Sequence, residues 1–250
     1  MDERTGATAG AKIGAKSGAK SGAKSGEAGA GRRSAGPRPA AVLLAAGESR
    51  RMGGINKLLL EINGVPLVKR TLFALSGSGV DELVVVLGHD ADRIEPLLAD
   101  FPVTLVRNPD HASGQMSSVH AGLAALRGDF DAILVALADQ PLLNGQDVTA
   151  LIGAFKKRER GSVVVPTYQG ARGNPIILAG AVRDEILASG ANLGCRRFIE
   201  THPELAASFE VGNDHYTFDL DTREDIARLE ARLGRPVSGW RDAPAPAPAS

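Results

Sequence analysis

Charged side chains from three distant parts of the sequence could together bind a polyphosphate and a metal ion. Arg51 and Lys57 are cations in a glycine-rich segment, and Asp139 follows an apolar run. Asp219 and Asp221 are two residues apart, so in an extended chain their side chains point to the same side. Magnesium takes a few carboxylates together with phosphate oxygens and water, and cations with backbone N–H groups suit a polyphosphate. These residue types therefore point to magnesium–polyphosphate chemistry.

The cations lie in segment 44–57, which is rich in small residues. Ala45, Ala46 and Gly47 let backbone N–H groups come close to a ligand, and Gly53 adds a second glycine position. The segment has neither the Gly-Lys-Ser/Thr ending of a Walker A loop nor the Gly-x-Gly-x-x-Gly of a dinucleotide-binding loop. From spacing alone, a phosphate-binding loop and a solvated basic loop both stay open.

The carboxylates follow or precede predicted regular elements. Asp139 ends the apolar run 133–138, and a carboxylate at the carboxyl end of a central strand lies over the ligand crevice of an α/β sheet. We expect Asp139 to hold magnesium together with Asp219 or Asp221. Two alternatives stay open: Asp139 could open a turn, and Asp221 or Thr222 could cap the last helix.

These residues are positioned by a regular alternation of short apolar runs with amphipathic segments, which begins at residue 40. Continuous apolar strands separated by helices indicate an α/β fold, with a mostly parallel central sheet covered by helices on both faces. The predicted strands are 41–45, 82–88, 103–107, 132–138, 162–166, 176–178 and 215–219, and the predicted helices are 66–76, 90–99, 117–126, 147–157, 181–188, 196–201 and 222–233.

Composition limits the class of protein. The 250 residues carry 29 basic and 29 acidic side chains. A single cysteine, Cys195, excludes an internal disulfide framework and a cysteine-based zinc site. No apolar run approaches the ~20 residues of a membrane span, and the first residues lack the apolar stretch of a secretory signal. We therefore expect a cytoplasmic protein that does not enter a membrane.

The two ends of the chain differ from its middle. Residues 1–38 are rich in Gly, Ala, Lys and Ser and carry eight basic and three acidic side chains, which predicts a disordered basic arm. An inert tail is favoured there over a tether to nucleic acid or an acidic partner, because no aromatic residues interleave the lysines. Residues 236–250 are predicted to be an Ala/Pro-rich flexible tail, which leaves 39–235 as one folded domain.

The motifs of this domain resemble a known family. Leu-Ala-Ala-Gly-x-Ser-x-Arg-Met-Gly at 44–53, followed by Lys-Leu-Leu-Leu from Lys57, resembles the opening motif of the MobA-like nucleotidyltransferases, and most of all their molybdenum cofactor cytidylyltransferase branch. Asp-Gln-Pro at 139–141 is similar to the family's Asp-x-Pro metal motif, and Asp-Leu-Asp-Thr at 219–222 to its closing motif. The resemblance covers residues 40 to about 234 and implies a single Rossmann-like nucleotidyltransferase domain, a three-layer α/β/α structure.

The resemblance also implies roles for individual residues. Gly47, Arg51 and Lys57 would hold the triphosphate, although Gly54 makes the spacer before Lys57 one residue longer than in the family motif. The magnesium ligands would be Asp139 and Asp219 or Asp221. Gln115 and Ser117 would contact the base and ribose; Ser117 or Ser118 could instead cap the next helix. Segment 168–175 would face the acceptor, with Asn174 where many relatives have histidine.

The implied reaction is transfer of a nucleoside monophosphate from an NTP to a phosphorylated acceptor, with release of pyrophosphate. The branch suggests CTP, molybdopterin as acceptor, and a molybdenum hydroxylase or its chaperone as partner. Ala45-Ala46-Gly47 favours CTP over the GTP of the Ala-Gly-Gly branch. The alternatives are a sugar- or polyol-phosphate nucleotidyltransferase and a non-catalytic chaperone that binds molybdenum cofactor.

Overall fold

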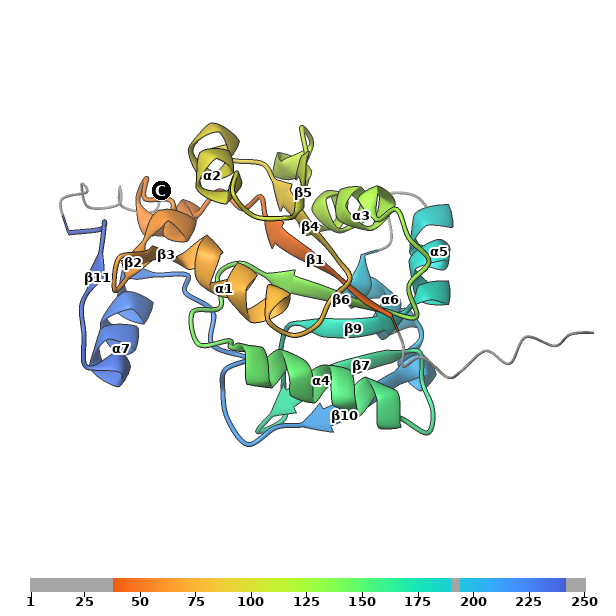
Figure 1. Ribbon diagram of the computed structural model, residues 1–250. Coiled ribbons are helices and arrows are strands. Elements are labelled where there is room, and N and C mark those ends of the chain that lie inside the picture. Colours follow the sequence, from red (N-terminus) through yellow and green to blue (C-terminus); the bar gives the residue numbers. More distant parts are fainter. Residues whose placement is uncertain (1–37, 190–193, 242–250) are drawn as a thin grey trace, which may run out of the picture. The chain divides into compact units, whose positions relative to one another are not determined.

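The computed structural model describes residues 38–189 and 194–241, all of which belong to one compact unit, residues 36–250. The unit is built on an eight-stranded sheet (Figure 1). The first strand of the chain, β1 (Pro39–Ala45), lies inside this sheet and is buried along its whole length. β6 (Ala132–Leu137) and β4 (Glu82–Leu87) flank it, both parallel to it, and β5 (Thr104–Arg107) follows β4.

The other half of the sheet contains the antiparallel strands. β9 (Ile176–Ala179) runs antiparallel between β6 and β7 (Val163–Tyr168). β10 (Ala206–Glu210) is parallel to β7 on its outer side, and the short β8 (Ala171–Arg172) folds back on the end of β7. The prediction of a mostly parallel central sheet is confirmed.

Helices cover both faces of this sheet because successive residues of a strand point to opposite sides. Ala41, Leu43 and Ala45 of β1 belong to a core cluster with residues of α1 (Leu67–Ser76), α2 (Ala91–Leu98) and α4 (Gly145–Lys157). The alternate residues of β1 face α3 (Gln115–Ala125), α5 (Gly180–Ala188) and α6 (Cys195–Thr201). The predicted three-layer α/β/α arrangement is thereby confirmed.

A small second sheet, absent from the sequence prediction, lies beside the last helix. β2 (Glu61–Ile62) pairs with β3 (Val65–Pro66) and β11 (Val237–Ser238), next to α7 (Arg223–Leu233) (Figure 1). Val237 is 2% exposed in a cluster with Met52 and Leu220, and its N–H donates to a Glu230 carboxylate oxygen at 2.8 Å. Ordered structure thus continues past residue 235, where the sequence placed the end of the domain.

The predicted strand at 215–219 is wrong. The N–H groups of Thr217 and Phe218 both bond to the Asp214 carbonyl, which makes hydrogen-bonded turns there. One strand of the main sheet that the sequence prediction missed is β10, whose sequence Ala-Ala-Ser-Phe-Glu has no β-branched residue and so gave little strand signal.

Residues 1–37 of the predicted arm and 242–250 of the predicted tail lie outside the described residues. In the part of the chain that the structure describes, the helices are too short or too polar to cross a membrane.

Candidate active site

The segment after β1 folds into two short 3-10 turns that carry the predicted cations. The first is η1 (Arg50–Met52), and Lys57 begins the second. Gly53 and Gly54 have φ of 68° and 85°, a left-handed backbone that glycine adopts without a Cβ clash. The Lys57 N–H donates to the Ser49 hydroxyl at 3.2 Å. Two consecutive left-handed glycines therefore take up the longer spacer and still direct Lys57 inward.

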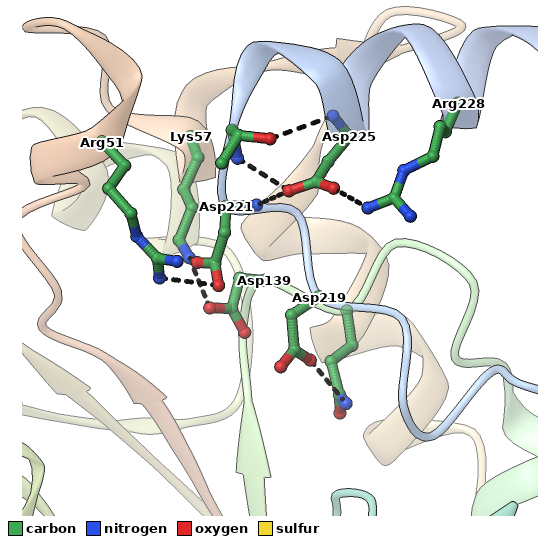
Figure 2. A network of polar contacts seen from close by, with 9 residues as sticks. Arg51, Lys57, Asp139, Asp219, Asp221, Asp225 and Arg228 are labelled. Atoms are coloured by element: carbon green, nitrogen blue, oxygen red, sulfur yellow. Dashed lines mark hydrogen bonds and ion pairs between the residues drawn. The ribbon is translucent and has the colours of Figure 1, made fainter. Parts of the chain in front are cut away.

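The Lys57 ammonium lies between two carboxylates from distant parts of the chain. Its Nζ is 2.5 Å from Asp139 Oδ2 and 2.6 Å from Asp221 Oδ1. The guanidinium of Arg51 reaches the other oxygen of Asp221 at 2.8 Å. Figure 2 shows these four side chains converging from three segments of the chain. The charged groups that the sequence expected to meet are thus brought together.

The backbone around the two carboxylates holds them in place. Asp139 follows β6, and its carbonyl accepts a hydrogen bond from the Leu220 N–H at 2.9 Å. Thr222 caps α7 in a capping box with Asp225, and the Asp225 carboxylate also accepts from the Asp221 N–H. Thr222 therefore takes the cap, while the Asp221 side chain points to the cations. The capping alternative holds for Thr222 and is wrong for Asp221.

Electrostatics favour a charged lysine in this position. Burial alone would lower the pKa of Lys57, but the carboxylates of Asp139 and Asp221 outweigh it and raise that pKa above its ordinary value. The lysine thus balances part of the negative charge of the two aspartates.

One oxygen of the Asp139 carboxylate is free to bind a metal ion. Asp139 Oδ1 is buried and has no hydrogen-bond partner among the described residues, a costly state for a carboxylate oxygen. In residues 38–189 and 194–241, no cluster of three or more Asp, Glu, His or Cys side chains is arranged to hold a metal. The donors present suit an ion that takes two carboxylates and completes its shell with phosphate and water, as magnesium does.

Asp219, the third predicted metal ligand, points elsewhere. It accepts a hydrogen bond from the Gln140 amide at 3.0 Å and lies apart from Lys57 (Figure 2). Burial, together with the nearby charges of Asp139 and Asp221, raises the pKa of its carboxyl to about 6. The three aspartates influence one another electrostatically, but only two of them contact the cation.

A first cavity of about 440 Å³ opens over this group, at the carboxyl ends of β1 and β6. Of the predicted site residues, Gly53, Ser117 and Asp219 lie outside its lining, as far as the described residues show. The predicted residues that line it are Ala45, Ala46, Gly47, Arg51, Lys57, Gln115, Asp139 and Asp221; those that the prediction missed include Glu48, Ser49, Arg50, His111, Gly114 and Ser118.

Neither Ser117 nor Ser118 caps α3, because both lie inside the helix. Gly114 occupies the N-cap of α3, and the side-chain amide of Asn108 donates to the hydroxyls of both Ser117 and Ser118, at 2.9 and 3.0 Å. Ser117 also donates to the carbonyl of Asp110. Ser117 thus fastens the loop that forms the cavity wall, and Ser118 is the serine that faces the cavity. The helix starts at Gln115, two residues earlier than predicted, so the serines fall in its first turn instead of at the cap position.

A second, larger cavity of about 810 Å³ adjoins the first and shares Gln115 and Leu137 with it. Arg172, Gly173 and Asn174, from the segment expected to face the acceptor, line this cavity. Its floor is apolar, and the remaining lining comes mainly from α6 and the residue before it. The other lining residues are Met116, Val119, Val135, Val165, Ile176, Gly194, Cys195, Arg196, Arg197, Ile199, Glu200 and Thr201.

Two adjoining cavities over the strand ends, one of them edged by cations and paired carboxylates, fit the nucleotidyltransferase that the sequence motifs predict. The family comparison agrees: the model of the MobA-like NTP transferase domain matches residues 41–206. The chain belongs to this family.

Individual relatives carry several names. Nicotine blue oxidoreductase of Paenarthrobacter nicotinovorans is 31% identical over 193 residues, which cover 75% of this chain and 94% of that protein. The bifunctional protein GlmU of Kineococcus radiotolerans is 43% identical over 196 residues, 76% of this chain but 38% of GlmU. The chain therefore spans well under half of that bifunctional relative.

Solved structures share the fold. A nucleotidyl transferase from Methanothermobacter thermautotroptrophicus superposes with a TM-score of 0.67 at 24% identity, over 79% of this chain and 98% of that one. Rv0371c from Mycobacterium tuberculosis gives a TM-score of 0.64 at 24% identity, over 77% and 97% of the two chains. At this level of identity the likeness establishes the Rossmann-like architecture.

Proposed function

We propose that this nucleotidyltransferase moves CMP from CTP to a molybdopterin-type phosphorylated acceptor and releases pyrophosphate. The observation that carries the proposal is the position of Lys57, between Asp139 and Asp221 at the edge of a cavity that adjoins a second one. The first cavity would take the nucleotide, and the second would take the acceptor.

Each group near Lys57 has a task in this reaction. Backbone N–H groups of the loop that begins at Ala46 would bind phosphate oxygens. Arg51 and Lys57 would neutralise the charge that builds on the leaving pyrophosphate. Asp139 and Asp221 would hold Mg²⁺, with Asp219 nearby, and that ion supplies further neutralisation of the triphosphate when bound.

The chemical step itself makes modest demands on the protein. An oxygen of the acceptor phosphate attacks the α-phosphorus of the NTP; the new P–O bond forms as the bond to the β-phosphate oxygen breaks. An acceptor phosphate is already anionic, so a strong general base is unnecessary. Catalysis then depends on alignment of the two substrates and on charge neutralisation.

We infer the acceptor and the nucleotide base from the family motif. Ala45-Ala46-Gly47 favours CTP, and the molybdenum cofactor branch would make a molybdenum hydroxylase or its chaperone the next partner. A sugar- or polyol-phosphate acceptor is the second candidate. Asn174 lines the second cavity, where it can donate a hydrogen bond but does not titrate near neutrality as histidine would.

A pyrophosphate-release assay that crosses the four NTPs with molybdopterin and several sugar phosphates tests the proposal. We expect release with CTP and molybdopterin, and loss of release in Asp139→Asn. Asp129→Asn, the same change at an exposed aspartate, should keep full activity.

Other outcomes decide among the alternatives. Release with a sugar phosphate but not with molybdopterin would favour the second candidate. A protein that binds molybdenum cofactor tightly but releases no pyrophosphate with any pair would be a chaperone. Reduction or oxidation of a substrate without pyrophosphate release would link it instead to its oxidoreductase-named relative.

A further inference from the structure

Gln140 directly follows Asp139, which lines the first cavity, and its side chain is almost completely buried, with 1% exposure. Its side-chain nitrogen donates to the Tyr216 carbonyl at 2.8 Å and to Asp219 Oδ1 at 3.0 Å. Both partners are acceptors, so only this orientation of the amide is compatible with them; the flipped amide would place its oxygen against two other oxygens. The two N–H groups of Gln140 therefore join the end of the β6 segment to the 214–221 segment.

The Tyr216 carbonyl is also the attachment point of the acceptor-side segment. The Asn174 N–H donates to it at 2.8 Å, so both lone pairs of this oxygen are occupied. A Cβ at Gly173 would lie 2.5 Å from the same oxygen, so the close approach depends on glycine. Gly173 and Asn174 line the second cavity, and Asp139 lines the first.

The peptide that carries this carbonyl is itself held firmly. The Tyr216 hydroxyl donates to the Asp147 carbonyl at 2.6 Å, and the His215 ring contacts the Asp147 carboxylate at 2.8 Å. Asp147 belongs to the capping box with Asn144 at the start of α4. These contacts hold the Tyr216 peptide in place, so its carbonyl can position both segments that bond to it, one at each cavity.

We propose that Gln140 is a positioning residue that fixes the acceptor-side segment against the Asp139 and Asp221 carboxylates through the Tyr216 carbonyl. It touches neither substrate; it sets the distance and angle between them. Its remaining amide oxygen is buried without a partner in the described part of the chain, a cost that an apolar side chain would avoid. The kinetic part of this inference rests on the proposed function, whereas the structural part does not.

The kinetic test uses Gln140→Met, which keeps the volume but removes both donors, and Gln146→Met as the matched change at an exposed glutamine. A displacement of about 1 Å between reacting groups costs about 100-fold in rate. We therefore expect Gln140→Met to lower kcat by about 10- to 100-fold and to raise the KM for the acceptor, with the KM for the NTP unchanged. Gln146→Met should behave as wild type. Equal effects on both KM values, or none, would overturn the inference.

A second substitution tests the same contact from its other side. Gly173→Ala places a methyl group against the Tyr216 carbonyl and leaves the Gln140 side chain intact. It should reproduce the rise in acceptor KM even if Gln140→Met fails to fold. An acceptor KM at the wild-type value in Gly173→Ala would count against the inference.

Hydrogen exchange separates this inference from the proposed function. Without the Gln140 donors the Tyr216 peptide is held less firmly, so the Asn174 amide should exchange about fivefold faster in Gln140→Met, the effect of losing one net hydrogen bond. This result is expected even if no pyrophosphate release is found, in which case the proposed function alone fails. Unchanged exchange at Asn174, with or without activity, would refute the link.

Discussion

Replacing Lys57 by methionine should destabilise the protein in a way that magnesium reverses. Asp139 Oδ2 and Asp221 Oδ1 both bond to the Lys57 nitrogen, at 2.5 and 2.6 Å, so they are at most about 5 Å apart. Two unit charges at that distance repel by roughly 3 kcal/mol at an effective dielectric constant near 20. Partial exposure of the carboxylates, 20% and 28%, reduces this to about 2 kcal/mol.

In a domain of this size, about 2 kcal/mol corresponds to a fall in Tm of about 4–8 °C. We expect Lys57→Met to show this fall in EDTA, measured by thermal unfolding with circular dichroism. Saturating Mg²⁺ should restore most of it, because a divalent cation placed between the carboxylates replaces the lost ammonium. Pyrophosphate release should stay low, because the proposed contact of Lys57 with the triphosphate is still missing.

The matched control is Lys156→Met, at an exposed lysine in the last turn of α4. It should leave Tm and the response to Mg²⁺ as in the wild type. The electrostatic reasoning is refuted if Lys57→Met unfolds at the wild-type temperature in EDTA, or if Mg²⁺ shifts variant and wild type by the same amount.

Three further outcomes are expected. Truncation of the chain before residue 236 should lower Tm and slow pyrophosphate release, because Val237 packs in one cluster with Met52 and Ile55 of the segment after β1. In the folded protein the pKa of Asp219 is about 6, above its ordinary 3.8, so its contribution to stability is complete below pH 4 and is lost as pH rises to about 6. Without metal, Asp219→Asn should therefore show a flatter dependence of Tm on pH across that window and should be more stable than the wild type at pH 7. Burial raises the pKa of Cys195 to about 12, so a thiol reagent at pH 8 should react far more slowly with the native protein than with the protein in denaturant.

The parts of the fold that could be predicted are those with strong local signals. The apolar runs of β1, β4 and β6 favour buried strands, and their alternation with amphipathic segments indicates the layered architecture. Asp139 could be placed because it follows such a run directly. The link between Lys57 and Asp139 followed because the carboxyl ends of parallel strands meet at one edge of the sheet.

The parts that could not be predicted depend on tertiary contacts. Residues 215–219 alternate in a way that is typical of a strand, but Tyr216 is held by Gln140, Asn174 and Asp147, which are distant in the sequence. The two-residue strands β2, β3 and β11 are too short for any periodicity. Whether Asp219 or Asp221 faces Lys57 depends on how α7 docks, since in an extended chain both would point the same way.

Lys57 and Asp221 are far apart in the sequence, and this distance affects when their contact can form during synthesis. The two residues are 164 positions apart, and Asp221 stands just before the last helix of the domain. A growing chain folds from its N-terminal part as it leaves the ribosome, so the sheet can assemble while the charge pair is still incomplete. The Asp221 carboxylate therefore joins the site after Lys57 and Asp139 have been synthesised, and a chain that stopped before residue 221 would keep the Lys57–Asp139 pair but leave the Arg51 guanidinium without its Asp221 partner.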